Sequence, residues 1–376
     1  MTHYDAIVVG CGPAGATAAL ELGRAGVQTL LVERERLPRA KPCGGGLTAK
    51  TVSALALDLS TVVERTVTAI DLSWRLARPA RLHSPDPLVC MVQRSRFDAF
   101  LVERALATGN VALADGCAVR GIELRADGGF DVRCVGDTHR ADVVLGADGA
   151  NGVVARALGL LRARRLLPAV EAEVEVDDAT LEHWHARMGI DMGSMRGAYG
   201  WVFPKRDHLN VGVGCFAPQG SNARHLNRYA AAHLAASVRG RVRRRVGSVL
   251  PLRPRGAPIA QGRALLLGDA AGLVDGFSGE GIYWAVRSAQ IAAAVVARGA
   301  ADAYAPAIDA ELMPELIEAR RWAALYLWWP RGCYSVPKRW PPAWRAVCGV
   351  LRGDSTFTAI GRRFGPLASL PIFRPA

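Results

Sequence analysis

The sequence predicts an α/β fold with three parts: a Rossmann-like dinucleotide-binding domain with a β-meander, an antiparallel-sheet substrate domain, and a helical C-terminal region. Three observations support this fold. Residues 6–33 form one βαβ pattern, with a buried strand, a glycine turn, a helix and a second buried strand. Residues 111–135 alternate around a turn at 126–129, which indicates a β-meander. Three alternating runs between residues 170 and 215 predict antiparallel strands.

The other predicted elements are loops, helices and short buried strands in turn. They are a Pro/Gly loop at 37–48, a helix at 95–107, a strand at 142–145, a helix at 222–238 followed by a basic linker, a buried strand at 264–267 and a helix at 281–298. This order predicts a discontinuous cofactor domain, a substrate domain and a run of helical fragments broken by proline. The expected bounds are 1–60, 90–165 and 258–300 for the first, 61–89 and 166–257 for the second, and 301–376 for the third.

The chain of 376 residues has a formal net charge of +13, and its basic residues are unevenly spread. Only four of the 47 basic residues are lysines, a bias that a GC-rich genome explains as well as a ligand does. Residues 319–376 hold ten basic residues and one acid, Asp354, so +9 of the +13 lies there. A local excess of this kind favours an acidic partner, such as anionic lipid headgroups or a diphosphate.

Cysteine usage and the N-terminal pattern predict an intracellular protein. The eight cysteines form no CxxC pair, and a strand begins at Tyr4 without the basic and apolar regions of a signal peptide. No apolar run approaches the roughly 18 residues that a spanning helix needs. We therefore expect free thiols and a cytoplasmic location, and a peripheral position at the inner face of the membrane stays open.

The strongest motif is Gly10-x-Gly12-x-x-Gly15, which follows a strand and opens a helix. Gly10 permits the tight turn, Gly12 lets backbone N–H groups approach a pyrophosphate at the positive helix end, and Gly15 lets helix and strand pack closely. Glu33 ends the second strand, where a carboxylate can accept hydrogen bonds from a ribose. We assign these residues and Ala14 to a dinucleotide cofactor.

A second motif separates FAD from NAD. Gly268-Asp269-Ala-Ala-Gly272 follows a short buried strand, and Asp269 can bind the ribityl chain of a flavin, a group that NAD lacks. The helix near Gly281 would aim its positive N-terminus at the pyrimidine edge of the isoalloxazine ring. Gly146-Ala-Asp-Gly149 ends another strand, and its alternative interpretation is an ordinary strand-ending turn. We therefore expect FAD as the cofactor.

Together these three motifs resemble those of the geranylgeranyl reductase family, FAD-dependent oxidoreductases with a p-hydroxybenzoate hydroxylase-like fold. The resemblance covers roughly residues 4–300. The family carries a Cys-Gly-x-Gly loop that faces the flavin, and Cys43, Gly44 and Gly46 match it. The glycines permit close approach to the ring, and a thiol is an ionisable group that can work near neutral pH. The alternative for Cys43 is a small apolar side chain that fills space.

The family also lines its isoprenoid site with a Pro-x-x-Tyr-x-Trp-x-Phe-Pro motif. Tyr199, Trp201, Phe203 and Pro204 match this motif, while Arg196 replaces its leading proline. Strand periodicity places the three aromatic side chains on one face. The resemblance therefore implies a substrate-binding aromatic wall, and the alternative is a core strand that carries three aromatic residues.

Further positions match the family where it contacts FAD. These cofactor-binding predictions are Arg94, Ala118, Gly281 and Ile282. The segment after Gly149 departs from the family, because Gly152 stands where many relatives have Ser and Ala155 where they have Arg. For this reason we assign no NADPH-binding role to that segment.

The resemblance implies reduction of carbon–carbon double bonds in the geranylgeranyl chain of a lipid, chlorophyll-type or quinone-type substrate. Reduced FAD would deliver a hydride to one alkene carbon, and a proton would reach the other, with Cys43 as the candidate catalytic relay. Orientation and exclusion of water would carry much of the catalysis, because an unactivated alkene develops little charge. The electron donor, NADPH or reduced ferredoxin, stays open.

The main alternative is an aromatic hydroxylase of the same fold, which would use NADPH and oxygen. A halogenase is disfavoured because the sequence has no Trp-x-Trp-x-Ile motif. The context of Glu33 and Asp269 disfavours a non-catalytic membrane or nucleic-acid binder, and we expect no nucleic-acid partner. We predict no metal site, because His183 and His185 would face apart on a helix.

The C-terminal region adds a membrane hypothesis. Five of the nine tryptophans lie within residues 322–344, interleaved with arginines. This pattern is typical of a segment at a membrane interface. The alternative is an arginine-rich helical cap whose tryptophans fill the core.

Overall fold

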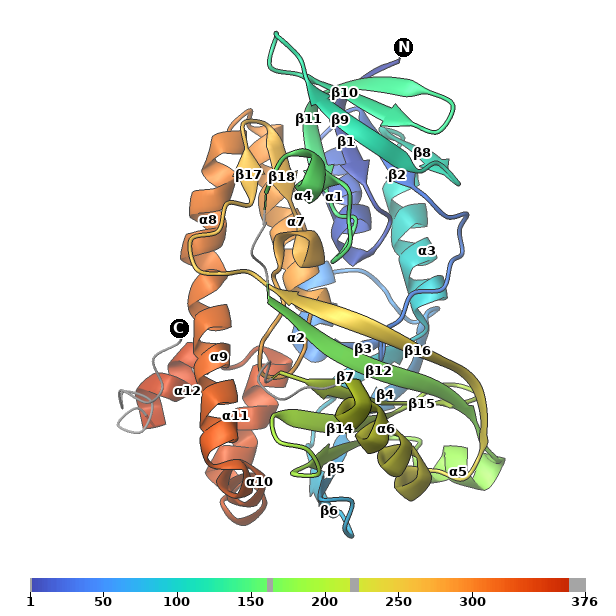
Figure 1. The fold of residues 1–376 in the computed structure, drawn as a ribbon, viewed down its shortest axis with the longest axis vertical. Helices are drawn as coiled ribbons and strands as arrows, with labels where there is room; N and C mark the ends of the chain where they lie inside the picture. Colours follow the sequence, from blue (N-terminus) through green and yellow to red (C-terminus); the bar gives the residue numbers. More distant parts are fainter. Residues whose placement is uncertain (1, 161–164, 217–222, 365–376) are drawn as a thin grey trace.

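A computed structural model describes residues 2–160, 165–216 and 223–364 (Figure 1). Its upper part in Figure 1 is a mostly parallel sheet, and strands β9 (Val119–Leu124) and β10 (Phe130–Cys134) extend it as an antiparallel meander. The other strands, in spatial order, are β17 (Ala260–Gln261), β18 (Ala264–Leu266), β11 (Thr138–Gly146), β1 (His3–Val9), β2 (Thr29–Glu33) and β8 (Val111–Asp115). This arrangement confirms the predicted βαβ unit and the predicted meander.

Helices cover this sheet and bury its central strands. All residues of β2 are buried, which is the expected state of a parallel strand covered on both faces. The helix α1 packs against two others, so the glycine turn at its start is held by a rigid core. The helices of this part are α1 (Pro13–Arg24), α3 (Arg94–Leu106), α4 (Val154–Ala157), α7 (Ile282–Ala297) and the 3-10 turn η1 (Gly268–Ala271).

The lower part of Figure 1 is a second, largely antiparallel sheet flanked by a small three-stranded sheet. Its strands, in spatial order, are β16 (Arg241–Leu252), β12 (Arg165–Glu175), β15 (Leu209–Cys215), β14 (Ala198–Pro204), β13 (Arg187–Met192), β5 (Ala69–Trp74) and β6 (Ala80–His83). The small sheet and the helices of this part are β3 (Gly46–Thr48), β7 (Val89–Val92), β4 (Val63–Val67), α2 (Ala49–Leu55), α5 (Asp178–His183) and α6 (Ala223–Ser237).

The basic segment after α6 is a long strand, so the prediction of a linker there was wrong. This strand, β16, pairs with β12 along its whole length and forms the edge of the sheet. Its first five residues are all exposed, and four of them are arginines. Charged side chains on an exposed edge strand prevent unwanted pairing with other chains, and they also hide the apolar alternation that marks a strand. The first residue of the predicted helix at 222–238 lies outside the described residues.

The C-terminal region is helical as predicted, and its longest helix joins the two cores. In α9, Leu316 packs in the core of the parallel sheet, while Ala323 and Tyr326 pack against residues of the second sheet. In Figure 1 this helix runs down the side of both parts. The helices of this region are η2 (Ala301–Ala303), α8 (Tyr304–Glu311), α9 (Met313–Trp328), α10 (Pro330–Arg339), α11 (Pro341–Arg352) and α12 (Phe357–Phe364).

Candidate active site

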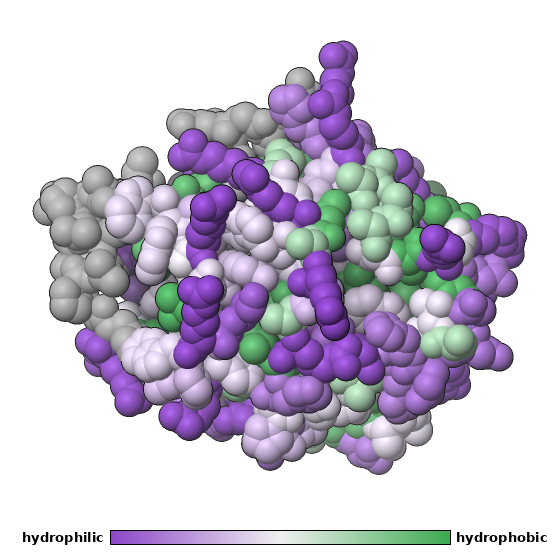
Figure 2. All heavy atoms as spheres, turned by 90° about the horizontal axis from the view of Figure 1, so that it is seen from below, coloured by the Kyte–Doolittle hydropathy of each residue, from purple (hydrophilic) through white to green (hydrophobic). Residues whose placement is uncertain are grey.

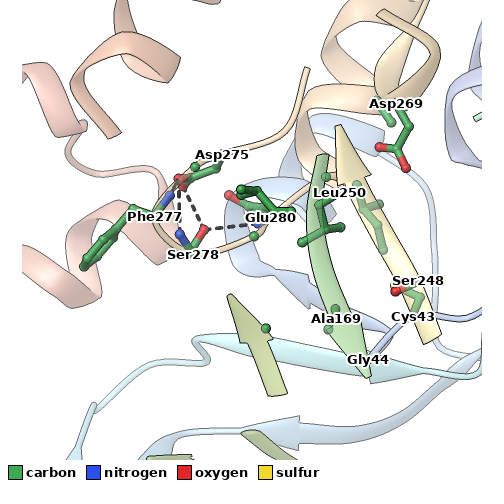
Figure 3. Close-up of a pocket in the computed structure, with 18 of the residues that line it drawn as sticks. Cys43, Gly44, Ala169, Ser248, Leu250, Asp269, Asp275, Phe277, Ser278 and Glu280 are labelled. Atoms are coloured by element: carbon green, nitrogen blue, oxygen red, sulfur yellow. Dashed lines mark hydrogen bonds between the residues drawn. The ribbon is translucent and has the colours of Figure 1, made fainter. Parts of the chain in front are cut away.

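One cavity of about 1510 Å³ is lined by residues of both large sheets and of the C-terminal helices, and Figure 3 shows part of its wall. All the predicted site residues line it except Gly15 and Pro204. Those that do are Gly10, Gly12, Ala14, Glu33, Cys43, Gly44, Gly46, Arg94, Ala118, Tyr199, Trp201, Phe203, Asp269, Gly281 and Ile282. The structure therefore brings residues from distant parts of the sequence to one site.

The glycine turn between β1 and α1 has the geometry that a pyrophosphate site needs. Gly10 has a φ of +105°, which favours glycine. A Cβ at Gly15 would lie 1.8 Å from the carbonyl oxygen of Gly10, so Gly15 sets the close packing of the turn. Around Gly12 the space is open, and the atoms nearest to a Cβ there would be Nη2 of Arg94 at 3.9 Å and Nη2 of Arg39 at 4.0 Å. An anion at this position would meet a helix N-terminus and two guanidinium groups.

A buried ion network stands beside this turn. Oε2 of Glu33 accepts hydrogen bonds from the backbone N–H of Cys11 at 3.0 Å and from Nε of Arg39 at 2.9 Å. Arg39 also pairs with Asp98 at 2.9 Å, and Arg94 makes two 2.8 Å bonds to the same carboxylate. Burial by itself raises the pKa of Glu33, but Arg39 and the N–H of Cys11 outweigh it and hold that pKa below its ordinary value.

This network contains residues that the sequence analysis missed. Arg39 follows Glu33 by six residues inside the Pro/Gly loop, and its partner Asp98 lies 59 residues further along. The available signal was the Arg94-x-x-x-Asp98 spacing, which places both side chains on one helix face. Glu33 thus orders the glycine turn, and its Oε1 accepts only a 3.3 Å bond from Glu35 and can still receive a ribose hydroxyl.

Asp269 has the properties expected of a ligand to flavin hydroxyls. It lies in η1 directly after β18, and its carboxylate accepts no hydrogen bond from any other described residue. Burial raises its pKa, while Lys41 and Arg94 act in the opposite direction. A buried carboxylate of this kind gains from hydroxyl donors, because an unsatisfied buried acceptor is costly. The ribityl chain of FAD would supply such donors, so these residues fit the predicted cofactor.

The turn that leads into α7 is held by Asp275, another residue that the sequence analysis missed. Its carboxylate accepts hydrogen bonds from the backbone N–H of Phe277 at 2.6 Å and from the hydroxyl of Ser278 at 2.7 Å (Figure 3). The hydroxyl of Tyr199 donates to the backbone oxygen of Ser278. The predicted aromatic wall is therefore tied to the turn that positions the N-terminus of α7.

Asp148, in the turn after β11, has a visible structural task. Its carboxylate accepts hydrogen bonds from the backbone N–H groups of Val153 and Val154 at 2.6 and 2.9 Å, at the start of α4. It also lines the cavity. The contacts in the structure therefore match the alternative of an ordinary strand-ending turn.

The Cys43 loop is held from both sides by buried ionisable groups. The backbone N–H of Cys43 donates to Oε1 of Glu171 at 2.8 Å, and the N–H of Gly45 donates to its Sγ at 3.4 Å. Nζ of Lys205 donates to the carbonyl oxygens of Gly44 at 2.7 Å and Gly45 at 3.3 Å. Burial lowers the pKa of Lys205 to about 8, while Cys43 and nearby carboxyl groups oppose that shift.

The three aromatic side chains lie on β14 in one row, as strand periodicity predicted. Ring centroids are 5.9 Å apart between Tyr199 and Trp201, and 6.1 Å apart between Trp201 and Phe203. Tyr199 pairs with Gly214 on β15 and Trp201 with Gly212, so glycines make room beneath the rings. A Cβ at Gly212 would lie 2.2 Å from the Trp201 ring. These glycines alternate in the sequence, but the pairing register was needed to connect them with the wall.

The wall contacts the Cys43 loop directly. A Cβ at Gly44 would lie 2.8 Å from the ring of Phe203 and 3.4 Å from Nε1 of Trp201. The same Nε1 donates to Oδ1 of Asn210 at 2.7 Å, which fixes the indole ring. A turn with a hydrogen bond from Ala198 to Met195 precedes β14, although Arg196 replaces the family's proline. The aromatic wall therefore forms one side of the cavity beside Cys43.

The described residues contain no cluster of three or more His, Cys, Asp or Glu side chains that could hold a metal ion. His183 ends α5, and His185 lies beyond it with Nδ1 at 3.1 Å from Nη1 of Arg65. The two histidines are therefore not held together on one helix.

Comparisons with known proteins identify the family. The FAD binding domain family matches residues 3–303. A chloroplastic geranylgeranyl diphosphate reductase from Oryza sativa subsp. japonica is 32% identical over 351 residues, which cover 86% of this chain and 72% of that protein.

Solved structures share the fold. A geranylgeranyl bacteriochlorophyll reductase-like protein from Thermoplasma acidophilum has a TM-score of 0.73 and 24% identity, over 85% of this chain and 86% of that one. A flavin-dependent brominase has a TM-score of 0.74 and 20% identity, over 94% of both chains. At these identities the structures show the fold alone. The match to the FAD binding domain and the reductase relative together show that this chain is an FAD-binding oxidoreductase of the geranylgeranyl reductase family.

Proposed function

We propose that the protein reduces carbon–carbon double bonds in the geranylgeranyl chain of a lipid. The observation that carries this proposal is the aromatic row of Tyr199, Trp201 and Phe203, which lines the same cavity as the FAD motif and contacts the Cys43 loop. Such a wall suits a flexible apolar chain, because it offers large contact area and excludes water. The activity of the rice relative supports the same substrate class.

Bound FAD, once reduced, supplies the hydride that goes to one carbon of the double bond. The other carbon needs a proton, and the Cys43 thiol is the group that we assign to hold it. The N–H of Gly45 and the guanidinium of Arg94 lie beside this sulfur and can stabilise it after the proton has left. Each double bond gains two hydrogens, and the thiol regains its proton from solvent.

The substrate-side residues contribute orientation. Gly212 and Gly214 let the rings of Trp201 and Tyr199 lie flat over β15, and Asn210 locks Trp201 in position. A fixed wall places the double bond at the flavin and keeps water away, which is the main lever for an alkene that develops little charge. Pro204 ends β14 outside the cavity lining, and its predicted contact with substrate stays a prediction.

The decisive test is the mass of the product. The purified protein is supplied with a reducing system and a geranylgeranyl lipid, and the extracted lipid is weighed by mass spectrometry. We expect a gain of two hydrogens per reduced double bond. A gain of oxygen, coupled to oxygen uptake, would instead identify a hydroxylase and overturn the proposal. Parallel reactions with NADPH and with reduced ferredoxin identify the electron donor.

The role of Cys43 is tested separately. Cys43→Ser should keep FAD bound, because the serine preserves the loop, and should lower the rate of double-bond reduction by about 100-fold or more, the range of a lost proton-transfer group. Cys90→Ser, which lies on β7 outside the cavity lining, is the matched control. Normal turnover by Cys43→Ser would remove the thiol from the mechanism.

A further inference from the structure

The C-terminal helices expose an unusual set of large aromatic side chains. Trp328 is 57% exposed, Trp329 46% and Trp340 45%, and Val347 nearby is also exposed. The other two tryptophans of this region behave differently, because Trp322 and Trp344 pack against core clusters. Core packing therefore accounts for Trp322 and Trp344 but leaves the other three tryptophans unexplained.

Unpaired positive charge surrounds these tryptophans. Arg331, Arg339 and Arg345 are exposed, and none forms an ion pair with a described residue. The sequence from residue 319 to 353 contains no Asp or Glu. Figure 2 shows long hydrophilic side chains that stand over pale and apolar surface on the lower face of the molecule. We call Trp328, Trp329, Trp340, Val347 and these three arginines the α9–α11 surface.

The α9–α11 surface adjoins the active-site cavity. Trp329 and Trp340 are both half-exposed and line the cavity, so they stand where it meets solvent. The inner sides of the same helices continue the lining with Val336 on α10 and Ala343 on α11. An apolar path therefore leads from these tryptophans to the aromatic wall of β14.

No helix among the described residues is long and apolar enough to span a bilayer. Short helices with exposed tryptophan and arginine side chains instead suit the plane of a membrane interface, where the indoles lie at headgroup level. The unpaired arginines select for anionic headgroups.

We propose that the α9–α11 surface docks on an anionic lipid bilayer and that the prenyl chain of a membrane lipid enters the cavity past Trp329 and Trp340. The docking itself is independent of the reaction, whereas the route of the chain rests on the proposed reductase function. The occupant is the bilayer, because an anionic surface complements both the charge and the exposed indoles.

Vesicle binding tests the docking. Binding of the full chain with FAD to vesicles of phosphatidylcholine, and of equal parts phosphatidylcholine and phosphatidylglycerol, is measured by co-sedimentation. We expect the wild type to bind only the anionic vesicles. A triple charge reversal, Arg331→Glu, Arg339→Glu and Arg345→Glu, should weaken this binding by about 100-fold, since each basic side chain near an anionic surface contributes about 1 kcal/mol.

The matched control carries the same change of charge elsewhere. Arg239→Glu, Arg263→Glu and Arg298→Glu alter three exposed arginines outside the α9–α11 surface and should bind almost as the wild type does. Trp328→Ala should weaken binding and reduce the quenching of tryptophan fluorescence by brominated lipids. Equal binding by wild type and the α9–α11 triple variant, or equal loss in both triple variants, overturns the docking.

Reduction assays separate the docking from the chemistry. With a short prenyl substrate in detergent, the α9–α11 triple variant should match the wild type, and with a lipid embedded in anionic vesicles it should be about 100-fold slower, in step with the loss of binding. Equal rates in vesicles would overturn the proposed route. A wild type that binds anionic vesicles through this surface but reduces no substrate in either setting would refute the reductase function and leave the docking intact.

Discussion

The Nζ atom of Lys205 lies 2.7 Å from the carbonyl oxygen of Gly44, so the residue that follows the aromatic wall also holds the loop of Cys43. The same ammonium donates to Gly45 at 3.3 Å and to Val92 at 2.8 Å. An ammonium has three N–H donors, and here each meets a carbonyl oxygen. A neutral amine would have only two donors for these three acceptors.

Reduction should therefore lose activity as Lys205 loses its proton. Burial lowers the pKa of Lys205 to about 8, so the third hydrogen bond to the loop disappears as the pH rises through that value. We expect the rate of double-bond reduction to fall with an apparent pKa of about 8. Lys205→Met should be slow throughout and lack this step. Identical pH profiles for the variant and the wild type would show that Lys205 does not control the loop.

The unfolding free energy should move in the opposite direction. The ordinary pKa of lysine is 10.5, and the folded value is lower, so the fold disfavours the charged form and carries its full cost below about pH 8. Relative to Lys205→Met, the wild type should gain up to about 3 kcal/mol of unfolding free energy as the pH rises from about 8 to about 10.5. Chemical denaturation at several pH values measures this. A difference that falls over this range would contradict the assigned pKa.

Gly44→Ala should crowd the contact between the loop and the wall. Its Cβ would lie 2.8 Å from two ring atoms of Phe203, and overpacking of this kind costs about 1–3 kcal/mol. Phe203→Leu in the same chain should recover part of that loss, which a double-mutant cycle of unfolding free energies would detect. Gly247→Ala is the control, because its Cβ would meet only a backbone oxygen at 3.8 Å. Strict additivity of Gly44→Ala and Phe203→Leu would rule out the contact.

Asp269→Ala should weaken FAD binding. Hydrogen bonds to a charged group contribute about 1.5–3 kcal/mol, so we expect the Kd for FAD to rise about 10- to 100-fold. Titration of the apoprotein with FAD, followed by flavin fluorescence, measures the change. Asp302→Ala, at an exposed position in η2, serves as the control. If Asp269→Ala held FAD as tightly as the control, the carboxylate would not be a cofactor ligand.

Arg39→Met should destabilise the apoprotein and raise the pKa of Glu33. It removes the charge that holds Glu33 and Asp98, and loss of one partner of a buried pair costs about 3–5 kcal/mol. Arg24→Met, at an exposed pair with Glu21, should cost less than about 1 kcal/mol. Thermal unfolding with and without FAD compares the variants. Equal losses in both would mean that the buried network contributes little.

The sequence by itself determined the features that follow from short-range spacing. The glycine turn, the two strands around α1 and the alternation of Tyr199, Trp201 and Phe203 depend on residues close together in the chain, where periodicity and backbone sterics act directly. The family motifs around Cys43 and Asp269 extended this to the cofactor and the substrate class.

Only the tertiary structure decided which distant charges meet. Asp98 completes the pair of Arg39, Lys205 clamps the Cys43 loop, and Glu171 receives its N–H, each across a long stretch of sequence. The strand β16 also emerged only in three dimensions, because its arginines are solvated at a sheet edge and hide the strand pattern. The physical reason is the same throughout: burial and ion pairing depend on which surfaces come together, and local patterns do not encode that.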